Sequence, residues 1–84
     1  MTPQGATVYI LESEHPHGQR YVGFTRLPIH VRLARHNAGD VPSTSRHRPW
    51  RLITAIWLPD PKRALALERY LKTGSGRAFA KRHL

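Results

Sequence analysis

The sequence predicts an α+β fold, a small three-stranded antiparallel sheet flanked by helices, with its elements in the order ββαβαα. Three runs rich in β-branched and aromatic residues are typical of strands, and a polar, turn-rich segment separates the first two. Three further segments carry helical spacing or the residues with which helices begin and end. With 84 residues, the chain is predicted to form a single domain, 1–84, near the lower size limit for unaided folding.

The first two predicted strands form a hairpin. They span residues 7–12 and 20–25, and the polar segment 13–19 is the predicted loop between them. Each strand carries a tyrosine at a similar point, Tyr9 in the first and Tyr21 in the second. Two packed aromatic residues on a hairpin are one explanation, and a shared site for two phenols is the other.

The middle of the chain predicts a helix, a loop and the third strand. The helix spans 28–37, because Pro28 suits a first turn and Gly39 suits a stop. Residues 40–49 form a polar, basic loop, and the apolar run 50–58 follows as a strand.

The last third of the chain predicts two helices. Asp60 is the expected N-cap of a helix over 61–72, with Pro61 at its first position. The sequence TGSG breaks this helix, and Ser75 is the expected cap of a short last helix over 76–83.

The charge of the chain indicates its class of partner. Fourteen Lys and Arg face five Asp and Glu, for a net charge of +9. Such an excess favours a polyanion, most often nucleic acid, and arginine supplies most of it with a planar fork that suits phosphate. The alternative is a solvated basic surface without a specific partner. We expect nucleic acid, with DNA favoured over RNA.

Other functional classes are disfavoured. The longest apolar stretch is far short of the roughly 20 residues that a membrane span needs, and the predicted helices would cover a core, so no membrane partner is expected. The N-terminal residues lack the basic start and long apolar core of a signal peptide, which favours a cytoplasmic location. The absence of cysteine excludes disulfides and thiolate metal sites.

One acidic residue falls on the apolar stripe of the 61–72 helix. Helical spacing places Glu68 on the face formed by Ala64, Leu67 and Leu71. A carboxylate there costs free energy unless a cation or hydrogen-bond donors satisfy it. A salt bridge to a neighbouring arginine, or a place at the rim of the stripe, is favoured over metal binding when the helix is considered alone.

The 28–37 helix carries a second notable pair. Ile29 and Leu33 define its inward side, and Arg32 and His36, four residues apart, share one flank of that side. For a lone pair, two surface residues with buried stems are the favoured explanation.

The basic loop and its surroundings supply candidate phosphate contacts, although a solvated loop is as good an explanation. The candidates are Arg35, Ser43, Thr44, Arg46 and Arg48. Both tryptophans, Trp50 and Trp57, are predicted to be core or sheet residues, and stacking on a base is considered for Trp50 only.

Five short motifs together resemble the GIY-YIG nuclease family. The chain carries, in this order, VYIL, YVG, RLARHNAG, RPWRLI and LERYLKTGSGRAF, and the resemblance covers nearly its whole length. It is similar above all to the stand-alone bacterial single-domain branch, and partly to a eukaryotic branch that cuts branched DNA and carries further domains. The fold that this resemblance implies agrees with the ββαβαα order.

The resemblance implies roles for particular residues. The candidate catalytic residues are Tyr9, Tyr21, Arg32, His36 and Glu68, with Glu68 as the metal ligand for one Mg²⁺, or Mn²⁺ as an alternative. The implied reaction is endonucleolytic hydrolysis of DNA, with branched or damaged DNA among the candidate substrates, leaving a 5′ phosphate and a 3′ hydroxyl.

The sequence departs from the family pattern at two places. Thr7 replaces the glycine of the first motif, and Phe24 stands where the excision-repair members have a lysine. Neither change removes the tyrosine, arginine and glutamate set.

The chemistry of this set leaves the general base open among Tyr9, Tyr21 and His36. Arg32 can pair with the nonbridging phosphate oxygens, and Arg32 and the metal together are expected to favour a phenolate. A noncatalytic nucleic-acid-binding module and a basic interaction protein, for instance one bound to ribosomal RNA, remain the alternative classes. A protein partner that supplies targeting is also considered.

Overall fold

A computed structural model describes residues 4–84 and has the predicted architecture. Its sheet is antiparallel with the strand order β2-β1-β3. The strands are β1 (Ala6–Glu14), β2 (His17–Thr25) and β3 (Trp50–Leu58). The predicted α+β class and ββαβαα order are therefore confirmed, with a short 3₁₀ turn, η1 (Ser45–His47), before β3.

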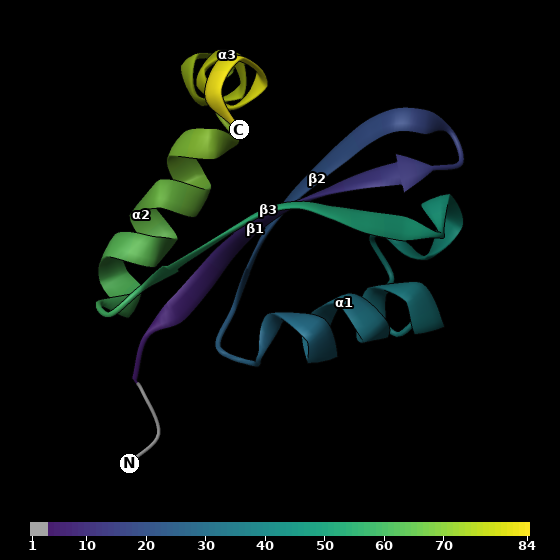
Figure 1. Cartoon of the computed structure of the whole chain (residues 1–84), viewed down its shortest axis with the longest axis horizontal. Coiled ribbons are helices and arrows are strands. Elements are labelled where there is room, and N and C mark those ends of the chain that lie inside the picture. Colours follow the sequence, from purple (N-terminus) through teal and green to yellow (C-terminus); the bar gives the residue numbers. More distant parts are fainter. Residues whose placement is uncertain (1–3) are drawn as a thin grey trace.

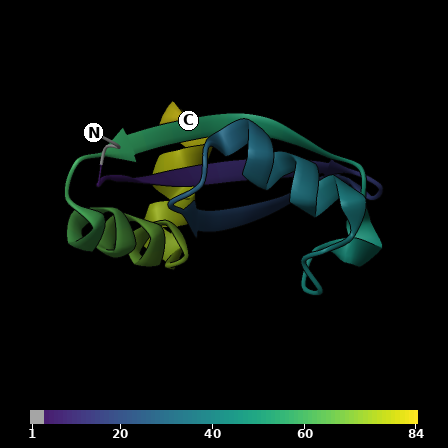
Figure 2. The ribbon, with the colours of Figure 1, turned by 90° about the horizontal axis from the view of Figure 1, so that it is seen from below.

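Helices cover both faces of this sheet (Figure 1). They are α1 (Ile29–Ala38), α2 (Pro61–Leu71) and α3 (Gly74–His83). Helix α1 lies on one side of the sheet, and α2 and α3 lie on the other. Figure 2 shows α1 lying across its face of the three strands.

The hairpin loop is shorter than the sequence predicts. Backbone pairing continues past the apolar residues, with Glu12 opposite Arg20 and Glu14 opposite His17. The predicted loop of 13–19 is therefore wrong, because backbone hydrogen bonds hold these polar residues in the strands.

Two of the predicted helix boundaries are confirmed in detail, and a third is corrected. Gly39 ends α1 in the left-handed region (φ 84°), and the Asp60 side chain accepts a hydrogen bond from the Lys62 amide at 2.9 Å. Helix α3, however, is capped by Thr73 and not by Ser75, because the Thr73 hydroxyl accepts from the Gly76 amide at 3.1 Å. The turn between α2 and α3 is so tight that a Cβ on Gly76 would overlap the backbone of α2.

The central strand β1 is buried on both faces and divides the core in two. Side chains of Ala6, Val8 and Ile10 pack against Ala64 and Leu71 on the α2–α3 side. The second cluster lies on the α1 side and contains Tyr9, Leu11 and Trp50, with Tyr21, Ile29 and Leu33 packed against it.

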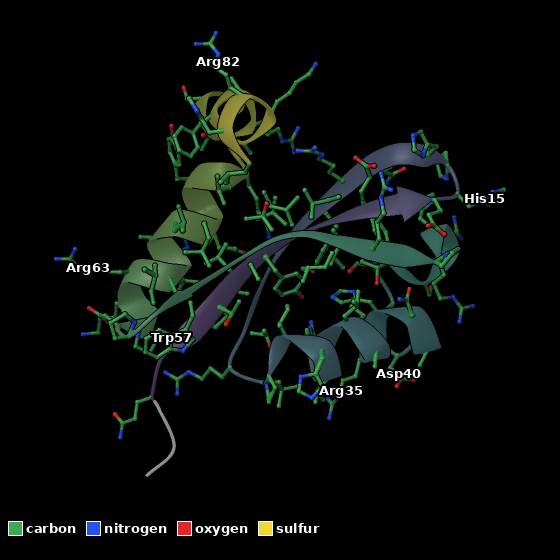
Figure 3. The ribbon with its side chains drawn as sticks, viewed as in Figure 1. His15, Arg35, Asp40, Trp57, Arg63 and Arg82 are labelled. Carbon is green, nitrogen blue, oxygen red and sulfur yellow. The ribbon has the colours of Figure 1, made fainter. Side chains whose placement is uncertain are left out.

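Both tryptophans lie in β3, as the prediction of core or sheet residues requires, but only Trp50 is buried. Trp50 is only 4% exposed, and its indole N–H donates to the Thr44 carbonyl oxygen at 2.9 Å. Trp57 is 52% exposed near the other end of β3 (Figure 3). A register shift in the β1–β3 pairing sets Trp50 opposite Ser13 and Trp57 opposite Thr7, so both lie on the Tyr9 face of the sheet. Packing covers only the Trp50 end, so Trp50 cannot stack on a base.

Candidate active site

The position of Tyr9 depends on the glycine of the second motif. Tyr9 lies directly opposite Gly23 in the β1–β2 pairing. A Cβ added to Gly23 would overlap the phenol end of the Tyr9 ring. Gly23 therefore leaves the space in which the Tyr9 ring extends over β2, and this links the two motifs of the hairpin physically.

Helix α1 brings two side chains to the Tyr9 hydroxyl. The Tyr9 oxygen lies 2.8 Å from Nε2 of His36 and accepts a hydrogen bond from Nε of Arg32 at 3.1 Å. Because Arg32 and His36 are one helical turn apart, both reach the same atom. The predicted flank of α1 therefore faces Tyr9.

His36 is fully buried, so its predicted placement at the surface is wrong. Its Nδ1 lies 2.7 Å from the Thr44 hydroxyl, which itself bonds to the Val41 carbonyl oxygen at 3.3 Å. A carbonyl can only accept, so the hydroxyl donates to Val41 and accepts from Nδ1–H. Nε2 of His36 then carries no proton and accepts the hydrogen bond of the Tyr9 hydroxyl.

The surroundings of this chain of hydrogen bonds favour neutral groups. Burial, assisted by the charge of Arg32, lowers the pKa of His36 from 6.5 to about 4. Burial raises the pKa of Tyr9 and outweighs the opposing hydrogen bond and charge of Arg32. Arg32 therefore favours the Tyr9 phenolate, as expected, but desolvation of the buried hydroxyl has the larger effect and keeps Tyr9 neutral.

Tyr21 lies beside these hydrogen-bonded side chains and is more accessible to solvent than Tyr9. Its ring centroid is 6.3 Å from that of Tyr9, 5.2 Å from that of His36 and 6.2 Å from that of Trp50. Tyr21 is partly exposed and lines a cleft of about 720 Å³, whereas Tyr9 is 1% exposed. Within residues 4–84 no hydrogen bond engages the Tyr21 hydroxyl.

Glu68 lies on α2 with a side chain that is 13% exposed. It pairs with Lys72, one turn along the helix, at 2.7 Å, so a lysine takes the place of the expected arginine. After burial and the Tyr21 charge, the charge of Glu68 adds a smaller contribution to the raised pKa of Tyr9, so the two side chains lie within electrostatic range of each other.

A single carboxylate fits one mode of magnesium binding. Mg²⁺ often keeps several waters and takes one or two carboxylates together with substrate phosphates. No group of three or more His, Cys, Asp or Glu ligands is found in the described part of the chain. Glu68 thus has the donor chemistry for such an ion, provided that Lys72 releases it.

Most of the predicted phosphate contacts are exposed, but one is not. Ser43, Arg35, Arg46 and Arg48 lie at the surface, Arg35 on the outer side of α1 in Figure 3, and they stay predictions. Thr44 is fully buried beneath α1, so it cannot contact phosphate. Thr44 is instead the hydrogen-bond partner of His36, a role that the sequence signals only weakly, through a short polar residue eight positions after a helical histidine.

Asn37 was also missed, and it fixes α1 to the sheet. Its side chain accepts from the Trp50 amide at 2.6 Å and donates to the Trp50 carbonyl oxygen at 3.0 Å. The sequence presents Asn37 only as the end of a helix, because both partner atoms belong to the backbone of a distant strand.

Comparison with known proteins decides the family. The model of the GIY-YIG catalytic domain matches residues 5–82. The chain belongs to the GIY-YIG family. No curated protein and no solved structure matches it.

Membership places the protein in a nuclease family whose domains are generally endonucleases. GIY-YIG membership also indicates a nucleic acid as the substrate, in agreement with the net charge of +9. Among residues 4–84, no helix is long and apolar enough to cross a membrane. The predicted cytoplasmic location stays a prediction.

Proposed function

We propose that the protein is a metal-dependent endonuclease that hydrolyses phosphodiester bonds in DNA and leaves a 5′ phosphate and a 3′ hydroxyl. The observation that carries the proposal is the hydrogen-bonded chain from Arg32 through Tyr9 to His36. These hydrogen bonds hold a guanidinium at the hydroxyl of Tyr9, whose ring packs beside the partly exposed Tyr21. A scaffold that needed only to fold would have no reason to fix a charged group there.

Arg32 supplies the positive charge for the phosphate. Its Nε is engaged by Tyr9, which orients the planar guanidinium, and among residues 4–84 no hydrogen bond or ion pair uses its two terminal nitrogens. Two parallel N–H groups match the nonbridging oxygens of a phosphodiester. Charge that develops on these oxygens in the transition state is then stabilised by a preorganised cation.

The two tyrosines are assigned different tasks. The Tyr9 hydroxyl is buried and already has two partners, so Tyr9 and His36 position Arg32. Tyr21 is partly exposed, and no hydrogen bond engages its hydroxyl in the described residues. In its phenolate form, Tyr21 accepts a proton from the attacking water, whose oxygen bonds to phosphorus as the bond to the 3′ oxygen breaks.

Glu68 is the residue assigned to the metal. When bound, Mg²⁺ or Mn²⁺ supplies charge that stabilises the leaving 3′ oxygen. Lys72 forms an ion pair with this carboxylate. The Lys72 side chain is 49% exposed, so it can turn toward solvent or toward a phosphate when a metal ion binds Glu68.

A second candidate function is a noncatalytic nucleic-acid-binding module. The Lys72–Glu68 ion pair favours this alternative, because a neutralised carboxylate is a poorer metal ligand. The two functions differ in what happens to bound DNA, because the endonuclease cuts it and the noncatalytic module leaves it intact.

The test of the proposed function is a cleavage assay on supercoiled, single-stranded and branched DNA, and on matching RNA. We expect DNA cleavage that requires Mg²⁺ or Mn²⁺ and stops with EDTA, and products that ligate without prior phosphorylation. Tight binding without cleavage of any substrate would favour the noncatalytic module.

A further inference from the structure

A basic cleft lies between the edge strand β2 and the helices α2 and α3. It has a volume of about 720 Å³, within the range of pockets that hold small ligands. Four cationic side chains line it, from three elements of the fold: Arg20, Lys72, Arg77 and Lys81. None of them was assigned to phosphate by the sequence motifs.

The positive charge of the cleft is only partly compensated. Its one acidic lining residue, Glu12, is shared between Arg20 and Arg51. Within residues 4–84, no carboxylate lies within ion-pair distance of Arg77 or Lys81. These two residues are four apart on α3 and therefore project from one side of the helix. Two neighbouring, uncompensated cations indicate an anionic occupant.

The floor of the cleft differs from its walls. The half-buried side chain of Val22 and the alkyl stems of the lysines and arginines supply its apolar atoms, above the buried side chains of Ile10, Leu71 and Ala80. A flat patch of lysine and arginine would suit the phosphates of any nucleic acid. An apolar floor suits the bases of an unpaired strand, because a duplex keeps its bases inside the stack.

The cleft borders the candidate active site at the edge strand β2. Tyr21 is a lining residue of the cleft, but its ring packs against His36 and Tyr9 on the opposite, α1 side of the sheet. Lys72 lines the cleft as well and pairs with Glu68. A strand held in the cleft would therefore lie next to Glu68, and it would reach the two tyrosines around the edge strand β2.

We propose that this cleft binds an unpaired nucleic-acid strand, with Arg77 and Lys81 on its phosphates and the apolar floor beneath its sugars and bases. The proposal rests on the proposed function for the link between the cleft and cleavage, but binding itself needs no turnover. It makes a substrate with a single-stranded arm the preferred one.

The test compares two double variants that remove the same charge. Arg77→Ala with Lys81→Ala alters the cleft. Arg63→Ala with Arg82→Ala is the control, because both of these side chains point away from the sheet in Figure 3 and are exposed. Affinity is measured by fluorescence anisotropy for a labelled oligothymidine and for a duplex, in EDTA and over a range of salt concentrations.

We expect the cleft variant to bind the single strand about tenfold more weakly than the native protein, and the control variant to lose little. Each phosphate contact on a single strand contributes about 0.7 to the slope of log affinity against log salt, so the cleft variant should lose about 1.4 from that slope. The two variants should lose duplex affinity equally.

Two outcomes would overturn the proposal. Equal weakening of single-strand binding by both variants would assign the effect to net charge, and an unchanged cleft variant would remove Arg77 and Lys81 from the interface. If the cleft variant behaves as expected but the native protein cuts no substrate, the proposed function fails while the binding site stands.

Discussion

The Tyr9 hydroxyl donates to Nε2 of a histidine that water does not reach, His36, across 2.8 Å. This bond requires the neutral imidazole, because a protonated Nε2 could not accept it. The same requirement makes the stability of the protein depend on pH.

Stability is expected to fall as the pH drops from about 6.5 to about 4. In the unfolded chain His36 has its ordinary pKa of about 6.5 and binds a proton as the pH falls below that value. In the folded protein the pKa of His36 is lowered to about 4, so the proton binds only near that pH. The shift corresponds to roughly 3 kcal/mol of unfolding free energy, present above pH 6.5 and lost by pH 4.

Urea denaturation at a series of pH values measures this loss, and NMR titration of His36 measures the pKa directly. His36→Gln should flatten the pH dependence, whereas the exposed His30→Gln should leave it as in the native protein. A His36 resonance that titrates near pH 6.5 would contradict the assignment.

Gly23→Ala is expected to displace the Tyr9 ring. The new Cβ would overlap the phenol end of Tyr9, which is held by its two partners and cannot move without breaking those bonds. We expect a loss of about 1–3 kcal/mol in unfolding free energy, as for other overpacked cores.

Gly74→Ala is the matched control for this substitution. A Cβ at Gly74, in the first turn of α3, meets no atom within 4 Å. This variant should be unchanged or slightly more stable than the native protein. Equal destabilisation by both substitutions would argue against a specific contact between Gly23 and Tyr9.

Removal of the Tyr21 hydroxyl and removal of the Tyr9 hydroxyl should have different effects on cleavage and stability. Tyr21→Phe should lower the single-turnover cleavage rate by about 10²-fold or more, the scale of a lost general base, with little change in stability. Tyr9→Phe leaves Nε2 of His36 unpaired in the core, so it should destabilise the fold by about 1–3 kcal/mol.

Tyr70→Phe provides the control for these variants, because Tyr70 is 43% exposed and stacks on Phe79 away from the site. Rapid-quench kinetics and thermal unfolding together separate the two effects. A larger loss of rate from Tyr9→Phe than from Tyr21→Phe, in folded proteins, would exchange their roles.

Local patterns in the sequence were sufficient to find most of the candidate site. Helical spacing places Arg32 and His36 on one flank, and strand pairing places Tyr9 and Tyr21 in one hairpin, because both relations span few residues. The caps at Asp60 and Gly39 are local in the same way.

Contacts between distant segments could not be predicted. The burial of Thr44 depends on how its loop folds beneath α1, and the exposure of Trp57 depends on a register shift in the β1–β3 pairing. The raised pKa of Tyr9 follows from burial, and a list of neighbouring charges does not reveal burial.

The account rests most heavily on Glu68 as the metal ligand of a nuclease. Glu68→Gln keeps the shape of the side chain but removes the negative charge that would bind a divalent ion. Asp40→Asn is the matched control, since Asp40 is exposed at the far end of α1 (Figure 3) and makes no ion pair in the described residues.

The decisive measurement is the single-turnover rate of Mg²⁺-dependent cleavage of a DNA with a single-stranded arm by the native protein, Glu68→Gln and Asp40→Asn. We predict native cleavage, an unchanged rate for Asp40→Asn and a loss of about 10²-fold or more for Glu68→Gln, with DNA affinity in EDTA preserved in all three. Cleavage by Glu68→Gln at the native rate would contradict the account.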